Sequence, residues 1–339
     1  MAKLTVAILG LDRLGLSIAL RLRTYVAKGG KHEFELIGYD SRDDYEKPAR
    51  KLKVLDKVER KPYSAVASAD LVIMNLPFDE LRAAYELIAS DLRDGVVLLD
   101  TAAIKQPSEA WADQLLSAEQ HWIGFTAVVN ADYLLEHQLG AERASDDYFH
   151  ESTIYLTPSV KSMKEAIDLA VNFAVILGGK PAFLDPAEHD SLSAITEQMP
   201  QLLSVAAYSA AIRHSAWGDA KRLTNSPFGV QTRYLFTHHP DGLRDEWMAN
   251  RERLGRAIDD VVDVLRDLRE RLAENDEAAV EAFLMEASDD YQDWINRRHK
   301  GDWDEHASQR VQLDNTIASS LFGGAISKRL FGGDKDGRN

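Results

Sequence analysis

The sequence lacks cysteine altogether among its 339 residues, so disulfide bonds, thiolate metal sites and cysteine nucleophiles are excluded. Basic residues are scarce relative to acidic ones, 40 against 55, which gives a formal net charge of −15. This charge disfavours nucleic acid and anionic membranes as partners, and we expect neither. No spacing typical of a metal site, such as HExxH, occurs, so we also expect no metal.

Long hydrophobic runs are missing as well, and no apolar stretch approaches the length that spans a bilayer. The first residues, MAKLTVAILG, pass directly into a strand pattern without the hydrophobic segment of a signal peptide, which predicts a cytoplasmic protein. The chain is 45% apolar and 28% charged, a composition typical of soluble globular proteins. Its length predicts two domains with separate cores.

Residues 1–185 alternate short apolar runs with amphipathic stretches. The runs LTVAILG, FELIGYD, ADLVIMNLP and GVVLLD are typical of strands, and strands that alternate with helices form a parallel sheet covered by helices. We therefore predict an α/β, Rossmann-like N-terminal domain. Residues 186–322 are nearly all helical in pattern and predict a helical domain for dimerisation and substrate binding. The Gly-rich, charged end predicts a flexible tail over 323–339.

The helical pattern also bears on assembly. Stretches such as DDVVDVLRDLRERLAE place apolar residues at helical spacing, with no strands for these faces to cover. Long amphipathic helices of this kind often bury their apolar faces in a second subunit, so a homodimer through the helical domain is expected. A self-contained helical bundle is the alternative.

The stretch GLDRLG lies between the first strand and the following helix, where a Rossmann fold has its phosphate-binding turn. Gly10 and Gly15 occupy the outer positions of the glycine fingerprint, and Asp12 occupies the middle one. In one interpretation Asp12 caps the helix and weakens dinucleotide binding. In the other, Asp12 points away and Arg13 supplies positive charge to the phosphates.

The carboxyl ends of the predicted strands meet at one edge of the sheet, so Gly10, Asp40, Pro77 and Asp100 should face one cleft. Asp40 ends the second strand, where an acidic residue accepts hydrogen bonds from ribose hydroxyls, which favours NAD. Arg42 follows closely and suits a 2′-phosphate, so NADP stays open. We predict Gly10, Asp12, Arg13, Gly15, Asp40, Arg42 and Pro77 as cofactor-binding residues.

Several segments in order resemble the prephenate and arogenate dehydrogenase family. They are ILGLDRLGLSIAL, ADLVIMNLP, LLDTAAIK, YFHESTIYLTP, DPAEHDSLSAI and QTRYL. The resemblance runs from the start to about Glu270 and implies the family's fold, its intertwined helical dimer and its reaction. That reaction is the oxidation and decarboxylation of a cyclohexadienyl acid with NAD(P) in tyrosine biosynthesis.

The chain departs from the family pattern where the chemistry is expected. In the motif D-x-x-S-x-K, here DTAAIK, Ala103 stands in the serine position. Thr126 stands where the family has the histidine that polarises the ring hydroxyl, and threonine is no general base by itself. In the pattern S-H-x-P-H, here EQMPQ, Gln198 and Gln201 replace histidines. The motif residues His189 and Asp190 are retained.

These observations leave a set of candidate site residues. Lys105 is the best remaining acid–base candidate, Asp100 is placed to orient it, and Glu197 offers a second carboxyl group. Arg233 resembles the family arginine that binds the substrate carboxylate, which implies a small anionic substrate. Gln198 and Gln201 either bind substrate or satisfy neighbouring groups in a helix packing layer. With Thr126, these residues form the predicted site.

Two functions are consistent with the sequence. The first is an NAD(P)-dependent oxidoreductase of the prephenate dehydrogenase type with an altered active site and an altered small anionic substrate. The second is a catalytically inactive relative that binds a ligand or partner protein through the same cleft. The cofactor site discriminates between them, because hydride transfer requires the nicotinamide.

Overall fold

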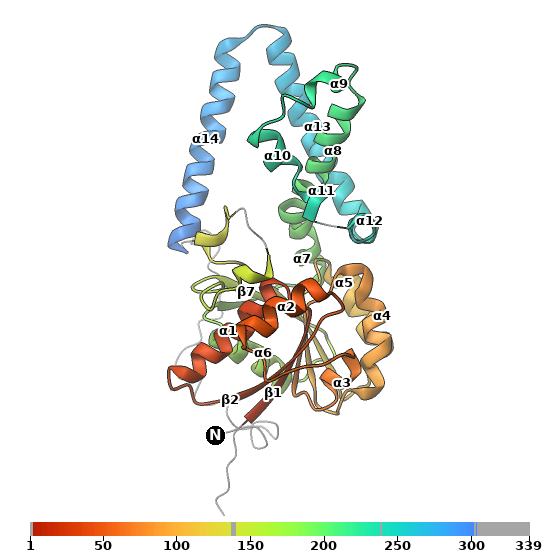
Figure 1. Cartoon of the computed structure of the whole chain (residues 1–339). Coiled ribbons are helices and arrows are strands. Elements are labelled where there is room, and N and C mark those ends of the chain that lie inside the picture. Colours follow the sequence, from red (N-terminus) through yellow and green to blue (C-terminus); the bar gives the residue numbers. More distant parts are fainter. Residues whose placement is uncertain (1–2, 137–139, 238, 302, 304–339) are drawn as a thin grey trace, which may run out of the picture.

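The computed structural model describes residues 3–136, 140–237, 239–301 and 303 (Figure 1). The predicted tail at 323–339 and the last part of the predicted helical domain lie outside the described residues. Within these residues the chain forms a sheet with helices on both faces, followed by a region of helices only (Figure 1).

The sheet has eight strands in the order β3-β2-β1-β4-β5-β6-β7-β8. The strands are β1 (Lys3–Leu9), β2 (Glu33–Tyr39), β3 (Lys57–Val58), β4 (Leu71–Met74), β5 (Val97–Asp100), β6 (His121–Ala127), β7 (Thr153–Pro158) and β8 (Lys180–Phe183). The helices of this region are α1 (Arg13–Ala27), α2 (Asp43–Leu52), α3 (Pro62–Val66), α4 (Phe78–Ile88), α5 (Lys105–Leu115) and α6 (Lys164–Ile176). The order reverses between β1 and β4, and ligands of such sheets bind beside that point.

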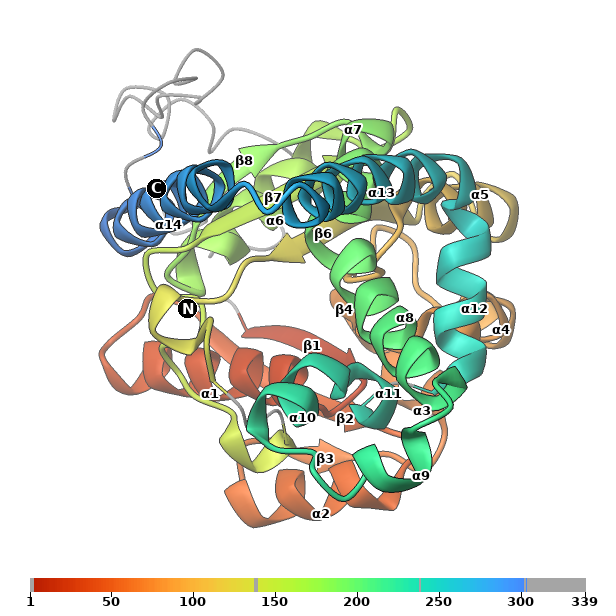
Figure 2. The ribbon, with the colours of Figure 1, turned by 90° about the horizontal axis from the view of Figure 1, so that it is seen from above.

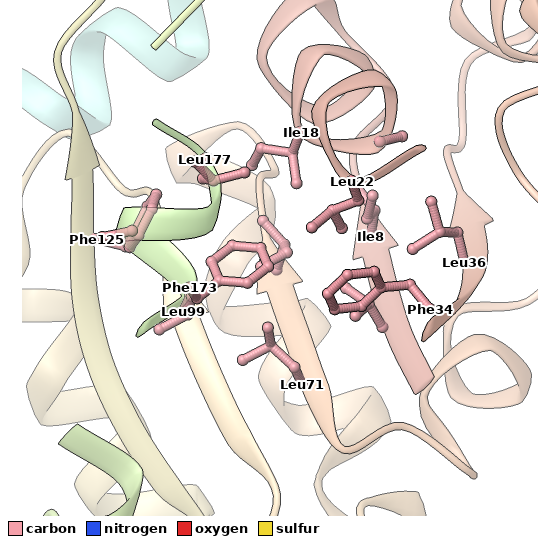
Figure 3. Packing of buried hydrophobic residues seen from close by; sticks show 14 of the residues in the cluster. Ile8, Ile18, Leu22, Phe34, Leu36, Leu71, Leu99, Phe125, Phe173 and Leu177 are labelled. Carbon is pink, nitrogen blue, oxygen red and sulfur yellow. The ribbon is translucent and has the colours of Figure 1, made fainter. Parts of the chain in front are cut away.

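Both faces of the sheet are covered by apolar side chains. On one face, Ile8 of β1 and Leu99 of β5 pack with Ile18 of α1 and Phe173 of α6 (Figure 3). The neighbouring strand residues point to the other face, where a second cluster joins the strands to α3 and α4. Burial on both faces explains why these strands read as continuous apolar runs. The predicted α/β, Rossmann-like fold is confirmed.

The sequence predicted a parallel sheet, but one pair of neighbouring strands is antiparallel. β6 pairs in parallel with β5, but β7 runs antiparallel to β6. The segment between β6 and β7 contains short 3-10 turns, η2 (Ala131–Tyr133) and η3 (Ala141–Arg143), and no crossover helix among its described residues. A parallel connection requires a crossover, so the chain returns antiparallel and this segment stays at the carboxyl edge of β1 and β4–β6.

The sheet ends at Phe183, and the rest of the described chain is helical. Its elements are α7 (Pro186–Ser193), a π-helical turn η4 (Ala194–Gln198), α8 (Met199–Arg213), α9 (Trp217–Ala220), α10 (Ser226–Thr232), α11 (Tyr234–Thr237), α12 (Pro240–Ala249), α13 (Arg251–Ala273) and α14 (Glu277–Lys300). α13 and α14 form a long hairpin that rises from the sheet edge and returns to it (Figure 1). Seen from above, α10 and α11 project over β1 and β2 (Figure 2).

The helical region therefore stands over the carboxyl edge of the sheet, which is where the candidate site lies. At the end of α14, Arg298 donates a hydrogen bond to the carbonyl of Val129, in the segment that follows β6. None of the described helices combines the length and the apolar character needed to cross a bilayer.

Candidate functional site

The turn between β1 and α1 requires glycine at both outer positions. Gly10 has φ +103°, and a methyl group there would lie 1.7 Å from the Asn75 carbonyl oxygen. A methyl group on Gly15 would lie 2.1 Å from the Gly10 carbonyl oxygen. The end of β1 therefore passes directly against the end of β4, and α1 begins directly against the turn. This is the close backbone packing that the glycine fingerprint provides.

Asp12 caps α1. Its Oδ1 accepts hydrogen bonds from the Gly15 N–H at 3.0 Å and from Asn75 Nδ2 at 2.7 Å. Asn75 Oδ1 in turn accepts from Thr101 Oγ1 at 2.9 Å. Burial raises the pKa of the Asp12 carboxyl group. Of the two interpretations of Asp12, the capping one describes this arrangement. The carboxylate accepts a hydrogen bond from a helix N–H group that would otherwise be available to a phosphate.

Arg13 does not face the turn. Its guanidinium pairs with Glu136 and lies 5.0 Å from the ring centre of Tyr133 and 4.5 Å from that of Tyr148. The predicted phosphate contact of Arg13 is therefore not the role that the structure gives it. Arg13 instead joins α1 to the segment that follows β6, through charge pairing and cation–π contacts.

Asp40 and Arg42 lie side by side at the end of β2. The Asp40 carboxylate accepts hydrogen bonds from the Leu11 N–H at 2.7 Å and the Arg42 N–H at 2.9 Å. Arg42 Nε lies 3.3 Å from Asp40 Oδ1, and its guanidinium stacks 4.1 Å from the ring centre of Tyr45. The Asp40 side chain is 1% exposed and that of Arg42 is 42% exposed. The predicted adenosine end of the site thus presents a cation backed by a buried carboxylate.

Pro77 also lies at this edge, as the residue that precedes α4 after the end of β4. It is two residues from Asn75, whose side chain bridges the glycine turn. The strand order therefore brings the predicted cofactor residues of β1, β2 and β4 to one edge. Their role in binding a cofactor stays a prediction.

Asp100 is fully buried and does not face the cleft. Its carboxylate accepts hydrogen bonds from Tyr85 Oη at 2.5 Å, Trp122 Nε1 at 3.1 Å and the Ala102 N–H at 2.6 Å. Ser108 Oγ is a further donor to the same carboxylate. A carboxylate with this many internal donors holds β5 to its neighbours, and the predicted part of Asp100 in catalysis stays a prediction.

Lys105 is fully buried as well. Its Nζ donates to the carbonyl oxygens of Asp100 and Ala102 at 2.8 Å each and to that of Phe125 at 3.3 Å. Burial lowers the pKa of Lys105 to about 8. An ammonium has three N–H donors, and all three have acceptors here. Lys105 therefore ties the ends of β5 and β6 together, and its predicted acid–base role stays a prediction.

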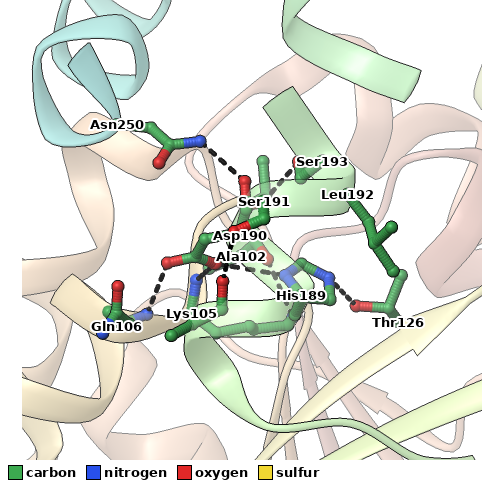
Figure 4. Close-up of polar contacts among 12 residues, drawn as sticks. Ala102, Lys105, Gln106, Thr126, His189, Asp190, Ser191, Leu192, Ser193 and Asn250 are labelled. Atoms are coloured by element: carbon green, nitrogen blue, oxygen red, sulfur yellow. Dashed lines mark hydrogen bonds and ion pairs between the residues drawn. The ribbon is translucent and has the colours of Figure 1, made fainter. Parts of the chain in front are cut away.

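Thr126 belongs to a chain of polar contacts that the sequence did not predict (Figure 4). Its Oγ1 lies 2.8 Å from His189 Nε2, and His189 Nδ1 lies 3.1 Å from Asp190 Oδ1. Asp190 also accepts hydrogen bonds from the backbone N–H groups of Lys105 at 2.6 Å and Gln106 at 3.0 Å, which begin α5. Burial lowers the pKa of His189. The retained pair in DPAEHD was the available sequence signal for these two residues.

Gln198 lies within the packing of the helices. It is fully buried, its Nε2 donates to the Glu246 carbonyl at 3.0 Å, and its Oε1 accepts from Asn250 Nδ2 at 2.7 Å. Both ends of the amide are therefore used internally, which is the arrangement expected of a helix packing layer, and the substrate contact of Gln198 stays a prediction. Gln201 differs, because its Oε1 is buried without a hydrogen-bond partner among the described residues. Its predicted role stays a prediction.

Glu197 and Arg233 both belong to the helical region. Glu197 reaches solvent from the π-helical turn η4, although partial desolvation raises the pKa of its carboxyl group. Arg233 ends α10, and the charges of both residues act on the hydroxyl group of Tyr234. Burial, together with the charges of Asp79 and Glu197, raises the pKa of Glu246 to about 7. The predicted roles of Glu197 and Arg233 stay predictions.

Comparison with known proteins shows what this chain is similar to. Residues 18–182 match the family model of the prephenate dehydrogenase nucleotide-binding domain. The chain is 24% identical over 299 residues to prephenate dehydrogenase of Bacillus subtilis, covering 88% of this chain and 77% of that protein.

Solved structures show the same fold. Prephenate dehydrogenase of A. aeolicus, in complex with hydroxyphenyl propionate and NAD+, has a TM-score of 0.71 at 20% identity, covering 86% of this chain and 99% of that one. Synechocystis arogenate dehydrogenase has a TM-score of 0.62 at 20% identity, with the same coverage of 86% and 99%. The resemblance noted in the sequence is confirmed: the chain is similar to prephenate and arogenate dehydrogenases in its nucleotide-binding domain and in its overall fold.

Proposed function

We propose that the protein is an NAD(P)-dependent dehydrogenase that oxidises a small hydroxy acid of the prephenate or arogenate kind. The observation that carries the proposal is the match of residues 18–182 to a nucleotide-binding domain, on a strand order that brings Gly10, Asp40 and Thr126 to one edge. The turn at Gly10 and Gly15 fits a dinucleotide, because neither position tolerates a side chain. A bound nicotinamide would supply the hydride acceptor.

We propose NAD as the preferred cofactor. The Asp40 carboxylate is held at the end of β2 by two backbone N–H groups, where it suits ribose hydroxyls. Arg42 offers a cation for a 2′-phosphate, but it already lies against Asp40, whose negative charge opposes that phosphate. Comparing the dissociation constants of NADH and NADPH tests this preference, and tighter binding of NADPH contradicts it.

The proposed substrate is a small anion. Arg233 is half-buried at the end of α10, and its planar guanidinium suits a carboxylate. Gln201 adds a buried amide oxygen with no protein partner among the described residues, which can accept a hydrogen bond from a hydroxyl group of the substrate. Substituting Arg233 by lysine keeps the charge and removes the bidentate geometry, so we expect KM for the acid to rise by about tenfold with little change in NADH affinity.

We further propose that the protein is a homodimer through its helical region. Leu265, Leu272, Leu284 and Met285 of the α13–α14 hairpin are each more than half exposed in a single chain. Apolar surface of this extent is typical of an interface, and a symmetric partner covers it with the same residues. Light scattering should give the mass of a dimer, and the double variant Leu272→Glu and Leu284→Glu should give a monomer.

One observation favours the alternative of a catalytically inactive relative that binds a ligand or partner protein through the same cleft. The Asp12 carboxylate and the Asn75 amide together bridge the glycine turn, and the carboxylate puts negative charge where pyrophosphate binds. An inactive relative has no need of that site.

A combined assay separates the two functions. The purified chain is titrated with NADH and NADPH, followed by nicotinamide fluorescence, and is then assayed with prephenate and with arogenate in the presence of NAD+ and NADP+. The dehydrogenase proposal expects dissociation constants of roughly micromolar size and reduced cofactor formed with one of the acids. Absence of both binding and turnover refutes it and leaves the binding protein.

A further inference from the structure

The contacts around His189 fix which ring nitrogen carries the proton. Asp190 accepts two backbone N–H groups at the start of α5, a setting that suits a carboxylate. The same carboxylate lies against His189 Nδ1 at 3.1 Å, so Nδ1 carries the hydrogen. His189 Nε2 then holds a lone pair, and the Thr126 hydroxyl at 2.8 Å donates to it. Thr126 Oγ1 is left with lone pairs that accept a further hydrogen bond.

The three residues differ in burial, from Thr126 at the surface to Asp190 in the interior. Thr126 lies near the carboxyl end of β6 and keeps partial contact with solvent. His189 is 6% exposed, and Asp190 is fully buried. Of the three residues, Thr126 is therefore the one whose hydroxyl group a molecule bound at the carboxyl edge of the sheet can contact. The His189 imidazole lies directly behind that hydroxyl group (Figure 4).

We propose that Thr126, His189 and Asp190 form a proton relay, in which His189 receives the proton of the substrate hydroxyl through Thr126. This inference rests on the proposed dehydrogenase function. It gives the site a general base from a different element, α7, in place of the histidine that is missing at position 126.

The step balances as follows. The substrate O–H proton passes to Thr126 Oγ1 while the Thr126 hydroxyl proton passes to His189 Nε2. The O–H bonding electrons form the new C=O bond, and a bound nicotinamide would supply the acceptor for the hydride of the adjacent C–H bond. Asp190 stabilises the imidazolium that results, and water later takes its proton. The roles are those of a hydroxyl–imidazole–carboxylate triad, used here for proton transfer.

The charges around His189 are compatible with this role. Lys105 of α5 lowers its pKa, whereas Asp190 on its own helix and Asp100 of β5 raise it. Burial is the largest effect and leaves the pKa of His189 below its ordinary value of 6.5. At neutral pH the imidazole is therefore unprotonated and able to accept a proton. Turnover should fall only on the acid side, as His189 becomes protonated.

A merely structural role, in which the imidazole ties α7 to β6, makes different predictions. The first test needs no substrate: nitrogen NMR of the full-length, ¹⁵N-histidine-labelled protein reads the tautomer of His189, with the signal identified by its loss in His189→Gln. At pH 7.5 the relay expects a protonated Nδ1 and an unprotonated Nε2. A hydrogen on Nε2 overturns the relay, because the ring then cannot receive the Thr126 proton.

The second test measures turnover against pH with prephenate or arogenate. His189→Gln and Thr126→Val should each lower kcat by about 10²- to 10⁴-fold, leave KM within about threefold, and abolish the acid limb of the profile. Thr126→Ser keeps the hydroxyl and should keep most of the activity. NADH affinity should be unchanged in all three variants, which shows that they fold.

His121→Gln is the matched control, because His121 is an equally buried histidine at the other end of the same strand, about 17 Å from Thr126. It should leave the acid limb in place. Turnover that survives His189→Gln with its acid limb intact refutes the relay alone. Absence of turnover in the wild type refutes the proposed function and the relay with it.

Discussion

Replacing Asp12 by glycine is the perturbation that most directly tests the cofactor site. The variant restores the glycine fingerprint and removes the carboxylate that accepts hydrogen bonds from the Gly15 N–H and Asn75 Nδ2. It also frees one N–H group at the start of α1 for a phosphate. We expect the variant to bind NADH more tightly than the wild type, because a negative charge beside the pyrophosphate is gone.

The magnitude follows from the charge and the contacts. A carboxylate about 5 Å from one phosphate charge opposes it by about 3 kcal/mol at an effective dielectric constant of about 20. Burial raises the pKa of Asp12, so part of this repulsion is relieved by proton uptake. We therefore expect a gain in NADH affinity of about 10- to 100-fold. Folding should lose about 1 kcal/mol, from a weaker helix cap and one lost hydrogen bond.

The assay is a fluorescence titration with NADH, accompanied by urea unfolding, on the wild type, Asp12→Gly and Asp12→Asn. The asparagine variant keeps an oxygen that caps α1 and removes only the charge. Asp276→Gly is the control, because Asp276 caps α14 through the Ala279 N–H in the helical region. It should lose similar stability and leave NADH binding unchanged.

The outcomes separate charge from bulk. Tighter binding by both Asp12 variants supports the electrostatic argument, and tighter binding by Asp12→Gly alone shows that the side chain blocks the site by its volume. Unchanged NADH affinity in both variants refutes the reasoning, since Asp12 would then have no effect on cofactor binding.

Three further predictions concern residues of the sheet edge. Gly15→Ala should destabilise the fold by about 2 kcal/mol or more, because its methyl group meets the Gly10 carbonyl. Gly218→Ala, at an exposed helix position, is the control and should not destabilise the fold. Equal unfolding midpoints of the two variants contradict this. The pKa of Lys105 is lowered to about 8, so between pH 8 and 10 the unfolded chain binds more protons than the folded chain. The free energy of unfolding of the wild type should therefore rise by about 2 kcal/mol over this range relative to that of Lys105→Met. A difference between the two proteins that stays constant with pH in urea unfolding refutes this. Arg42→Ala should weaken NADPH binding more than NADH binding, and equal losses in titration argue against a 2′-phosphate contact.

Much of the fold could be predicted from local sequence. The strands β1, β2, β4 and β5 are short apolar runs that end in polar or glycine residues, because both of their faces are buried by helices. The antiparallel β7 could not be predicted in the same way. Its run of residues, TIYLTP, has the same strand character in either direction. Its orientation goes with the lack of a crossover helix among the described residues between β6 and β7.

The sequence by itself determined the glycine turn and the polar residues that end the strands, because these depend on backbone conformation and on the edge that parallel strands share. The tertiary structure decided which of those residues face the cleft. Lys105 and Asp100 turn inwards, where carbonyl and hydroxyl groups of neighbouring elements surround them. His189 meets Thr126 across 63 residues of sequence. Such contacts join groups whose proximity is fixed only when the sheet order and the helix packing are fixed, so no local pattern of residues contains them.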